Sequence, residues 1–128
     1  MAALTPMQVA LEVMDRDWQW GVSDCCTAAC DAFLRLHGVD PMKPLRGRYT
    51  SRMGALRLIA VHGGWLAMTR FLAREAGLVT SHGGPGEIGL ADSGHGPALV
   101  FGVGDDLWAG KTDTGMQTLR GIERCWRV

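Results

Sequence analysis

The chain has 128 residues, 47% of them hydrophobic and 20% charged, which excludes a disordered protein and predicts one globular domain over 1–128. Thirteen basic and thirteen acidic side chains cancel, and no basic run indicates a nucleic-acid partner. No apolar run approaches the ~20 residues that cross a bilayer, and no signal peptide is recognisable, so we expect synthesis in the cytoplasm without membrane insertion.

A capping box opens the first predicted helix. Thr5 stands three residues before Gln8, and Pro6 occupies the first helical position, where a backbone N–H has no intrahelical partner. The spacing of the apolar residues predicts one buried face for this helix, made of Met7, Ala10, Leu11 and Met14.

Three further helices are predicted between residues 23 and 77. The second is capped by Ser23 or Asp24 and ends at His37–Gly38. The third begins after Ser51 and ends near 62–64, and the fourth spans about 65–76 before Gly77. The second helix carries an apolar stripe of Cys25, Ala29, Ala32, Phe33 and Leu36.

The second half of the chain changes to short apolar runs between glycine-rich turns. These runs predict strands at 87–92, 97–103, 106–111 and 124–128, with a hairpin turn at 103–106. Helices followed by a small antiparallel sheet predict an α+β domain. Three tryptophans, Trp65, Trp108 and Trp126, are expected in the core or at an interface.

Three of the four cysteines, Cys25, Cys26 and Cys30, fall within six positions of one predicted helix, a layout that does not suit a disulfide framework. No second cysteine or histidine pair is present to complete a zinc site, so we predict no metal and no cofactor. Cys26 and Cys30 are expected to pack as small buried side chains.

Cys25 stands at the start of the second helix, where unpaired backbone N–H groups lie near its sulfur. Helix N-termini stabilise thiolates, and the same N–H groups would stabilise an oxyanion formed by attack on a carbonyl. The preceding residues 18–21 would supply aromatic walls for a cleft. On these residues alone, small apolar packing is the favoured interpretation of Cys25, and a nucleophile is the alternative.

The WG-x-x-DC element at 20–25, the GE-I stretch at 86–88 and the strand pair that follows resemble the NlpC/P60 group of papain-like cysteine peptidases. The whole chain is similar to NlpC-related proteins encoded in tail-gene regions of phages and prophages. The shared features include RGRY-x-S at 46–51, the PAL strand and a CWRV-like end. The resemblance implies a papain-like fold with N-terminal helices packed on a small antiparallel sheet.

The resemblance also implies site residues. Cys25 matches the family nucleophile, His95 is the candidate base, and Trp20 and Asp24 are candidate substrate-binding residues. His95 lies one or two positions before the aligned base position. The family's third, orienting position falls near Trp108, Ala109 or Gly110, and none of these can orient an imidazole. Glu87 matches an acidic residue that opens the first strand and is expected to be structural.

The remaining histidines and a polar loop are assigned other roles. His37 lies twelve residues along the second helix from Cys25, about 18 Å away. His62 and His82 are expected to be exposed. We expect the side chains of 46–49, Arg46, Arg48 and Tyr49, to meet a substrate carboxylate or, preferably, a partner protein.

Two functions follow from the resemblance. In the first, the protein belongs to a phage tail tip or hub and hydrolyses peptidoglycan stem peptides, with Cys25 as nucleophile and other tail proteins as neighbours. In the second, it is a catalytically degenerate structural component of the virion tail that binds those neighbours. The WG-x-x-DC element favours the first function, and the displaced His95 favours the second.

Overall fold

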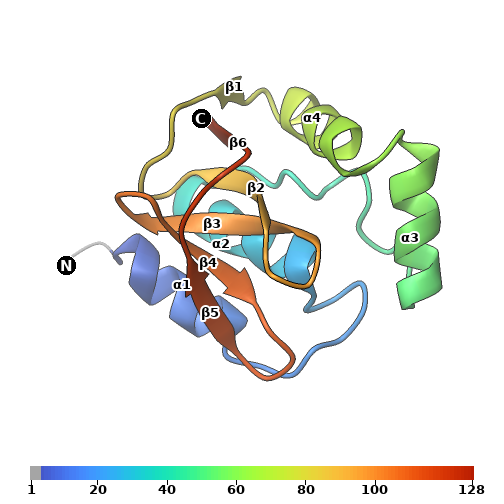
Figure 1. Ribbon diagram of the computed structural model, residues 1–128, viewed down its shortest axis with the longest axis horizontal. Coiled ribbons are helices and arrows are strands. Elements are labelled where there is room, and N and C mark those ends of the chain that lie inside the picture. The colour runs from blue at the N-terminus through green and yellow to red at the C-terminus, as the bar shows by residue number, and fades with distance from the viewer. Residues whose placement is uncertain (1–3) are drawn as a thin grey trace.

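The computed structural model describes residues 4–128, which form four helices and a six-stranded sheet (Figure 1). The helices come first in the chain: α1 (Pro6–Met14), α2 (Cys25–His37), α3 (Arg52–Val61) and α4 (Trp65–Glu75). The strands follow: β1 (Val79–Thr80), β2 (Ile88–Asp92), β3 (Pro97–Gly104), β4 (Leu107–Lys111), β5 (Met116–Leu119) and β6 (Arg124–Arg127). The prediction of an α+β domain is confirmed. No helix within the described residues is long and apolar enough to cross a membrane.

The sheet is antiparallel throughout and has the order β1-β6-β2-β3-β4-β5. The last strand of the chain, β6, therefore lies beside β2, where Ile88 faces both Phe101 and Trp126. The hairpin predicted at 103–106 joins β3 to β4, and Asp106 takes a φ of 48° in its turn. Strands β1 and β5 were not among the predicted strands.

Both faces of the sheet are covered. Helices α1 and α2 pack on one face, against alternate residues of β2 and β3 that include Leu90, Leu99 and Phe101 (Figure 1). The other face holds a smaller apolar cluster made of Ala91, Val100, Trp108 and Cys125. Trp108 and Trp126 are buried as predicted, whereas Trp65 is only half-buried.

Helix α1 buries a different face from the predicted one. Val9 and Val13 are buried beside Ala10 and Met14, whereas Leu11 is 48% exposed. Both candidate stripes have helical spacing, so periodicity alone does not separate them. The packing of α1 on α2 and β3 selects the stripe that contains the two valines.

Local capping signals are confirmed at the helix ends. The Thr5–Gln8 box is formed, Ser51 accepts the N–H of Gly54, and Gly38 ends α2 in the left-handed conformation with φ 74°. At α2 the cap is Asp24 and not Ser23.

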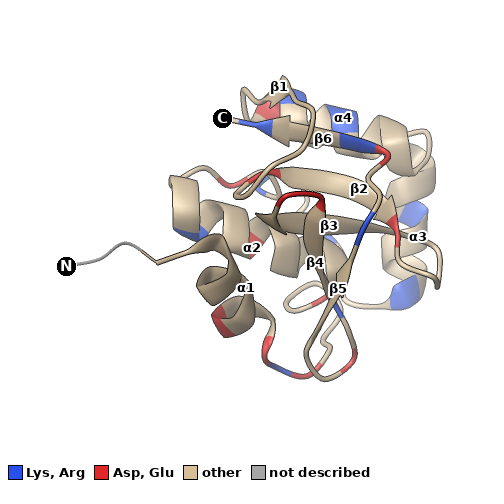
Figure 2. Ribbon diagram, turned by 60° about the vertical axis from the view of Figure 1, so that its left-hand side comes forward, with Lys and Arg blue, Asp and Glu red and all other residues tan. Residues whose placement is uncertain are grey.

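Helices α3 and α4 follow each other at one side of the molecule, with their axes in different directions (Figure 1). Helix α3 has no fully buried residue, whereas α4 buries Met68, Thr69, Leu72 and Ala73. The two helices carry four arginines and one glutamate, so this pair of helices is basic in a chain with no net charge (Figure 2).

Candidate active site

A cavity of about 630 Å³ lies between the N-terminus of α2, helices α3 and α4, and the turns at 93–96 and 112–115. Its volume is in the range usual for small-molecule sites. The four residues that the sequence singled out all line it: Trp20, Asp24, Cys25 and His95. Trp18 and Trp20 meet edge to face with ring centroids 5.0 Å apart, so residues 18–21 supply the expected aromatic wall.

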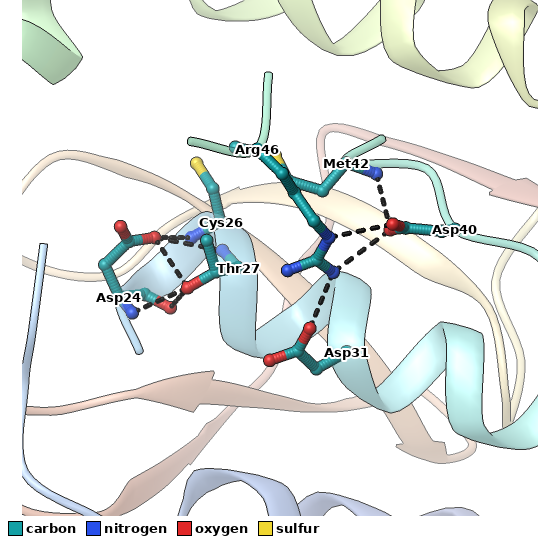
Figure 3. A network of polar contacts seen from close by, with 7 residues as sticks. All are labelled: Asp24, Cys26, Thr27, Asp31, Asp40, Met42 and Arg46. Atoms are coloured by element: carbon teal, nitrogen blue, oxygen red, sulfur yellow. Dashed lines mark hydrogen bonds and ion pairs between the residues drawn. The ribbon is translucent and has the colours of Figure 1, made fainter. Parts of the chain in front are cut away.

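Asp24 organises the start of α2 (Figure 3). Its Oδ1 accepts the N–H groups of Cys26 and Thr27 at 3.0 and 2.9 Å and the Thr27 hydroxyl at 3.2 Å. Its Oδ2 accepts the Gly21 N–H and the Tyr49 hydroxyl, both at 2.7 Å. The side chain is 1% exposed, so this carboxylate is occupied by contacts within the chain. These contacts support a positioning role for Asp24, and direct substrate binding by it stays a prediction.

Gly21 allows the WG-x-x-DC loop to close on the 49–50 segment. Its φ is 82°, and a Cβ built there would lie 2.3 Å from the Tyr49 carbonyl oxygen. Any other side chain would be strained in its backbone and would collide with a neighbouring main chain. Gly21 and Asp24 of the WG-x-x-DC element therefore have the same structural role, because both hold the loop against the start of α2.

Cys25 is the first residue of α2 and is partly exposed in the cavity. The next three N–H groups of the first turn have partners: those of Cys26 and Thr27 bond the Asp24 carboxylate, and that of Ala28 bonds the Asp24 carbonyl. The Cys25 N–H has no such partner among the described residues. One free donor therefore lies next to the thiol that would create an oxyanion.

The other cysteines have the expected structural character. Cys26 and Cys30 are buried, and all four thiols are free. The contact with the Cys25 sulfur, at 3.9 Å, together with burial raises the pKa of the Cys26 thiol, and burial raises the pKa of Cys30. Raised pKa values keep both thiols protonated and unreactive. No group of three metal-binding side chains occurs within residues 4–128.

His95 lies in the exposed turn between β2 and β3. Its backbone N–H donates to the Ser93 hydroxyl, which in turn donates to the Gly96 carbonyl. Within the described part of the chain, the His95 ring makes no hydrogen bond, and the Cys25 sulfur contacts only that of Cys26 at hydrogen-bonding range. The structure thus brings His95 and Cys25 to one cavity without joining them directly.

Residues 108–110, to which the resemblance assigns an orienting role, offer none in this structure. Trp108 is fully buried in the cluster on the far face of the sheet, and Gly110 lines the cavity without a side chain. Gln117 of β5, which pairs with Gly110, lines the cavity and donates to the Ser93 carbonyl at 3.4 Å. Sequence reasoning missed Gln117, because its place depends on the pairing of β5 with β4.

Lys111 is a second residue that sequence reasoning missed. It is 5% exposed and lines the cavity, and its Nζ donates to the carbonyl oxygens of Arg16, Thr112 and Gly115. Burial lowers the pKa of Lys111. Because all its contacts are to backbone oxygens, this residue holds the 16–18 loop against the β4–β5 turn.

None of the other three histidines lines the cavity. His37 contacts the Gly86 carbonyl at 2.6 Å, and His62 is half-buried against Phe71 with ring centroids 4.8 Å apart, not exposed as expected. His82 is exposed and does not line the cavity. Glu87 directly precedes β2 and also lies outside the cavity walls.

Two residues of the loop at 39–50, Arg46 and Tyr49, make polar contacts within the chain. The Arg46 guanidinium bonds Asp31 at 2.6 Å and Asp40 at 2.8 Å, as Figure 3 shows. Tyr49 is buried and donates to Asp24, and burial raises its pKa. The polar atoms of Arg46 and Tyr49 therefore brace α2, whereas contact of this loop with a substrate or a partner protein stays a prediction. Arg48 is exposed.

Comparison with known proteins gives one family. Its sequence profile matches residues 5–128, and it is described as a domain of unknown function, DUF6950. No curated protein and no solved structure matches the chain.

Proposed function

The chain belongs to the DUF6950 family, and we propose that it is a cysteine hydrolase with an NlpC/P60-like, papain-like fold. One observation carries this proposal: Cys25, at the first position of α2, presents a partly exposed thiol and a free N–H to a cavity that His95 also lines. The order of the elements along the chain, in which a capped helix is followed by a small antiparallel sheet, is consistent with the resemblance seen in the sequence.

The proposed reaction is amide hydrolysis by way of a thioester. His95 takes the proton of the Cys25 thiol, and the sulfur attacks the carbonyl carbon to form a C–S bond. The negatively charged carbonyl oxygen accepts a hydrogen bond from the Cys25 N–H. His95 then gives the proton to the nitrogen as the C–N bond breaks, and water, activated by the same imidazole, cleaves the thioester to release the acid and restore the thiol.

This reaction requires the turn at 93–96 to close on the start of α2. His95 is exposed, and its turn is tied to the sheet by the Gln117 contact. Catalytic hydrogen bonds are often long in ligand-free enzymes and tighten when substrate binds. Substrate bound between Trp20 and the turn would bring the imidazole to the thiol.

We propose peptidoglycan stem peptides as the substrate and the phage tail tip or hub as the place of action. These parts of the proposal rest on the resemblance of the whole chain to tail-region proteins. One contact site supports an anionic peptide: Arg52 lines the cavity, is exposed and has no carboxylate within ion-pair distance among residues 4–128. A guanidinium in that state is suited to a substrate carboxylate.

The decisive experiment is release of muropeptides from purified peptidoglycan, measured by mass spectrometry. The native chain should release them, and C25A and H95A should reduce release at least about 100-fold, as expected when a nucleophile or general base is lost. H82A is the matched control, since His82 is exposed outside the cavity, and it should keep full activity. No release by the native chain from several wall types would contradict the proposal.

A second candidate function has its own support. The missing hydrogen bond between Cys25 and His95, together with exposed apolar residues of α3 such as Met53 and Val61, favours a structural tail component that binds its neighbours. Under this alternative, tails assembled with C25A should be complete and infective, whereas charged substitutions at Met53 and Val61 should prevent assembly.

A further inference from the structure

The turn at 112–115, which joins β4 to β5, brings a carboxylate to the cavity wall. Asp113 lies in this turn, is exposed and lines the cavity. Within residues 4–128, its carboxylate takes part in no ion pair, and Arg52, which lines the same cavity, is not paired with it. The cavity therefore presents one negative and one positive side chain that are both available to a ligand.

Contacts that leave the Asp113 side chain free hold this turn in one conformation. The N–H of Thr112 donates to the Gly115 carbonyl at 2.9 Å, and the N–H of Gly115 donates to the Thr112 hydroxyl at 3.0 Å. The buried Lys111 ammonium donates to the carbonyls of both residues. The carboxylate of Asp113 is thus carried by a fixed turn, which lowers the cost of ordering it around a ligand.

Two aromatic rings lie beside Asp113. The backbone N–H of Trp18 donates to the Asp113 carbonyl at 2.6 Å, so these two residues are direct neighbours. The Trp20 ring meets the Trp18 ring edge to face, and both are half-buried and line the cavity. The face of a tryptophan ring attracts a cation within about 6 Å of its centroid. A carboxylate next to two such rings therefore suits a positively charged group.

The charges around the turn also favour a cation. Burial lowers the pKa of Lys111, and nearby Arg16 acts in the same direction. Three carboxylates close to Lys111 act in the opposite direction: Asp17, Asp113 and Asp15. Three carboxylates against two cations leave a local excess of one negative charge, and no ion pair joins any of these side chains within the described residues.

The aromatic rings are connected to the start of α2. Trp20 directly precedes Gly21, whose N–H donates to the Asp24 carboxylate at 2.7 Å. Asp24 in turn caps the helix whose first residue is Cys25. A group bound against the rings would therefore lie next to the segment that positions the thiol.

We propose that Asp113, Trp18 and Trp20 form a subsite for a primary ammonium group of the substrate. This inference rests on the proposed hydrolase function and narrows its substrate to peptides that carry such a group near the scissile amide. Peptidoglycan stem peptides carry primary amines, in a diamino acid or at a free N-terminus, so the subsite is compatible with the proposed substrate.

The test measures binding separately from hydrolysis. The full chain with C25A is titrated by calorimetry with three peptides: N-acetyl-Ala-γ-D-Glu-Lys amide, N-acetyl-Ala-γ-D-Glu-norleucine amide, and Ala-γ-D-Glu-norleucine amide with a free N-terminus. At least one of the two peptides with an amine should bind about 5- to 30-fold more tightly than the peptide without one. The peptide that is preferred identifies the source of the ammonium group. Equal affinities for the three peptides would overturn the subsite.

Variants assign the ammonium preference to residues. D113N removes the charge but keeps the carbonyl that accepts the Trp18 N–H, and W20L removes one ring, so each should reduce the preference about 3-fold or more. D113E, which keeps the charge, should retain more of it than D113N. D105N is the matched control, since Asp105 is an exposed turn carboxylate outside the cavity walls, and it should leave the preference unchanged. A preference that survives both D113N and W20L would overturn the assignment.

The binding and hydrolysis results separate the two proposals. Ammonium-selective binding without peptidoglycan cleavage by the native chain would contradict the proposed function and keep the subsite. Cleavage by the native chain, combined with equal binding of the three peptides, would contradict the subsite and keep the function.

Discussion

The two halves of the candidate site are held in different ways. At the start of α2, the Asp24 carboxylate accepts five donors from three segments and is 1% exposed, so Cys25 has one fixed position. On the other side, His95 lies in an exposed turn that a single 3.4 Å contact from Gln117 ties to β5. In the proposed reaction, the nucleophile would thus be preorganised and adjustment to substrate would fall to the base.

The largest effect should follow the loss of the cap. D24A leaves the Tyr49 hydroxyl and the Gly21 N–H without their acceptor and removes the helix cap, so the free energy of unfolding should fall by about 3–4 kcal/mol. Urea denaturation measures this loss. D24N, which keeps one acceptor oxygen, should lose less, and a loss below about 1 kcal/mol for D24A would show that the α2 half is not rigid.

Removing the Tyr49 hydroxyl should have the next largest effect. Y49F loses a hydrogen bond to a carboxylate, so the free energy of unfolding at pH 7 should fall by about 2 kcal/mol in urea denaturation.

The same residue gives a pH dependence. Burial raises the pKa of Tyr49 above its unfolded value of about 10. The contribution of Tyr49 to the free energy of unfolding is therefore complete below pH 10 and is lost as the pH rises further. Above pH 10 the free energy of unfolding of the native chain should fall by up to about 1.4 kcal/mol per pH unit because of this group. Cys26 and Cys30, whose pKa values are also raised, add a loss of the same sign. Y49F should show the smaller slope, and equal slopes would contradict the assignment.

A smaller effect is expected where α2 meets the 39–50 loop. R46M leaves Asp31 and Asp40 without their cation, but these two side chains are 30% and 18% exposed, so we expect the free energy of unfolding to fall by about 1 kcal/mol in the same assay. R35M breaks the exposed pair with Glu12 and should change stability by less than about 0.5 kcal/mol. A similar small loss in both variants would show that the loop is not braced through Arg46.

The smallest effect on stability should come from the His95 side. Q117A removes one long hydrogen bond and should change the free energy of unfolding by less than about 0.5 kcal/mol. Hydrogen exchange at 93–96 should nevertheless become faster, whereas exchange in α2 should not change. Unchanged exchange at 93–96 would mean that Gln117 does not hold the turn.

Sequence reasoning succeeded where the signal is local. The caps at Thr5, Ser51 and Gly38 act within four residues of themselves, and the α2 cap was narrowed to Ser23 or Asp24. The hairpin turn at 103–106 is a signal of the same short range. These features set the helices, the main strands and the place of Cys25.

The rest depended on contacts between distant segments. Tyr49 reaches Asp24 across 25 positions, so the sequence did not reveal that its loop braces the helix. Gln117 reaches the His95 turn only because β5 pairs with β4, and β5 itself was not predicted. In α1, two stripes with the same period competed, and only packing on α2 distinguishes them.

The arrangement at the start of α2 has a consequence for small inorganic ions. An open helix N-terminus offers several N–H groups and readily takes phosphate or sulfate. Here Asp24 occupies the amides of Cys26, Thr27 and Ala28 and adds its own negative charge beside them. Among the described residues of this turn, only the Cys25 N–H is left free. One donor is enough for the oxygen of a polarised carbonyl, but it is too few to bind a tetrahedral dianion. Phosphate buffers should therefore leave this thiol accessible to the proposed substrate.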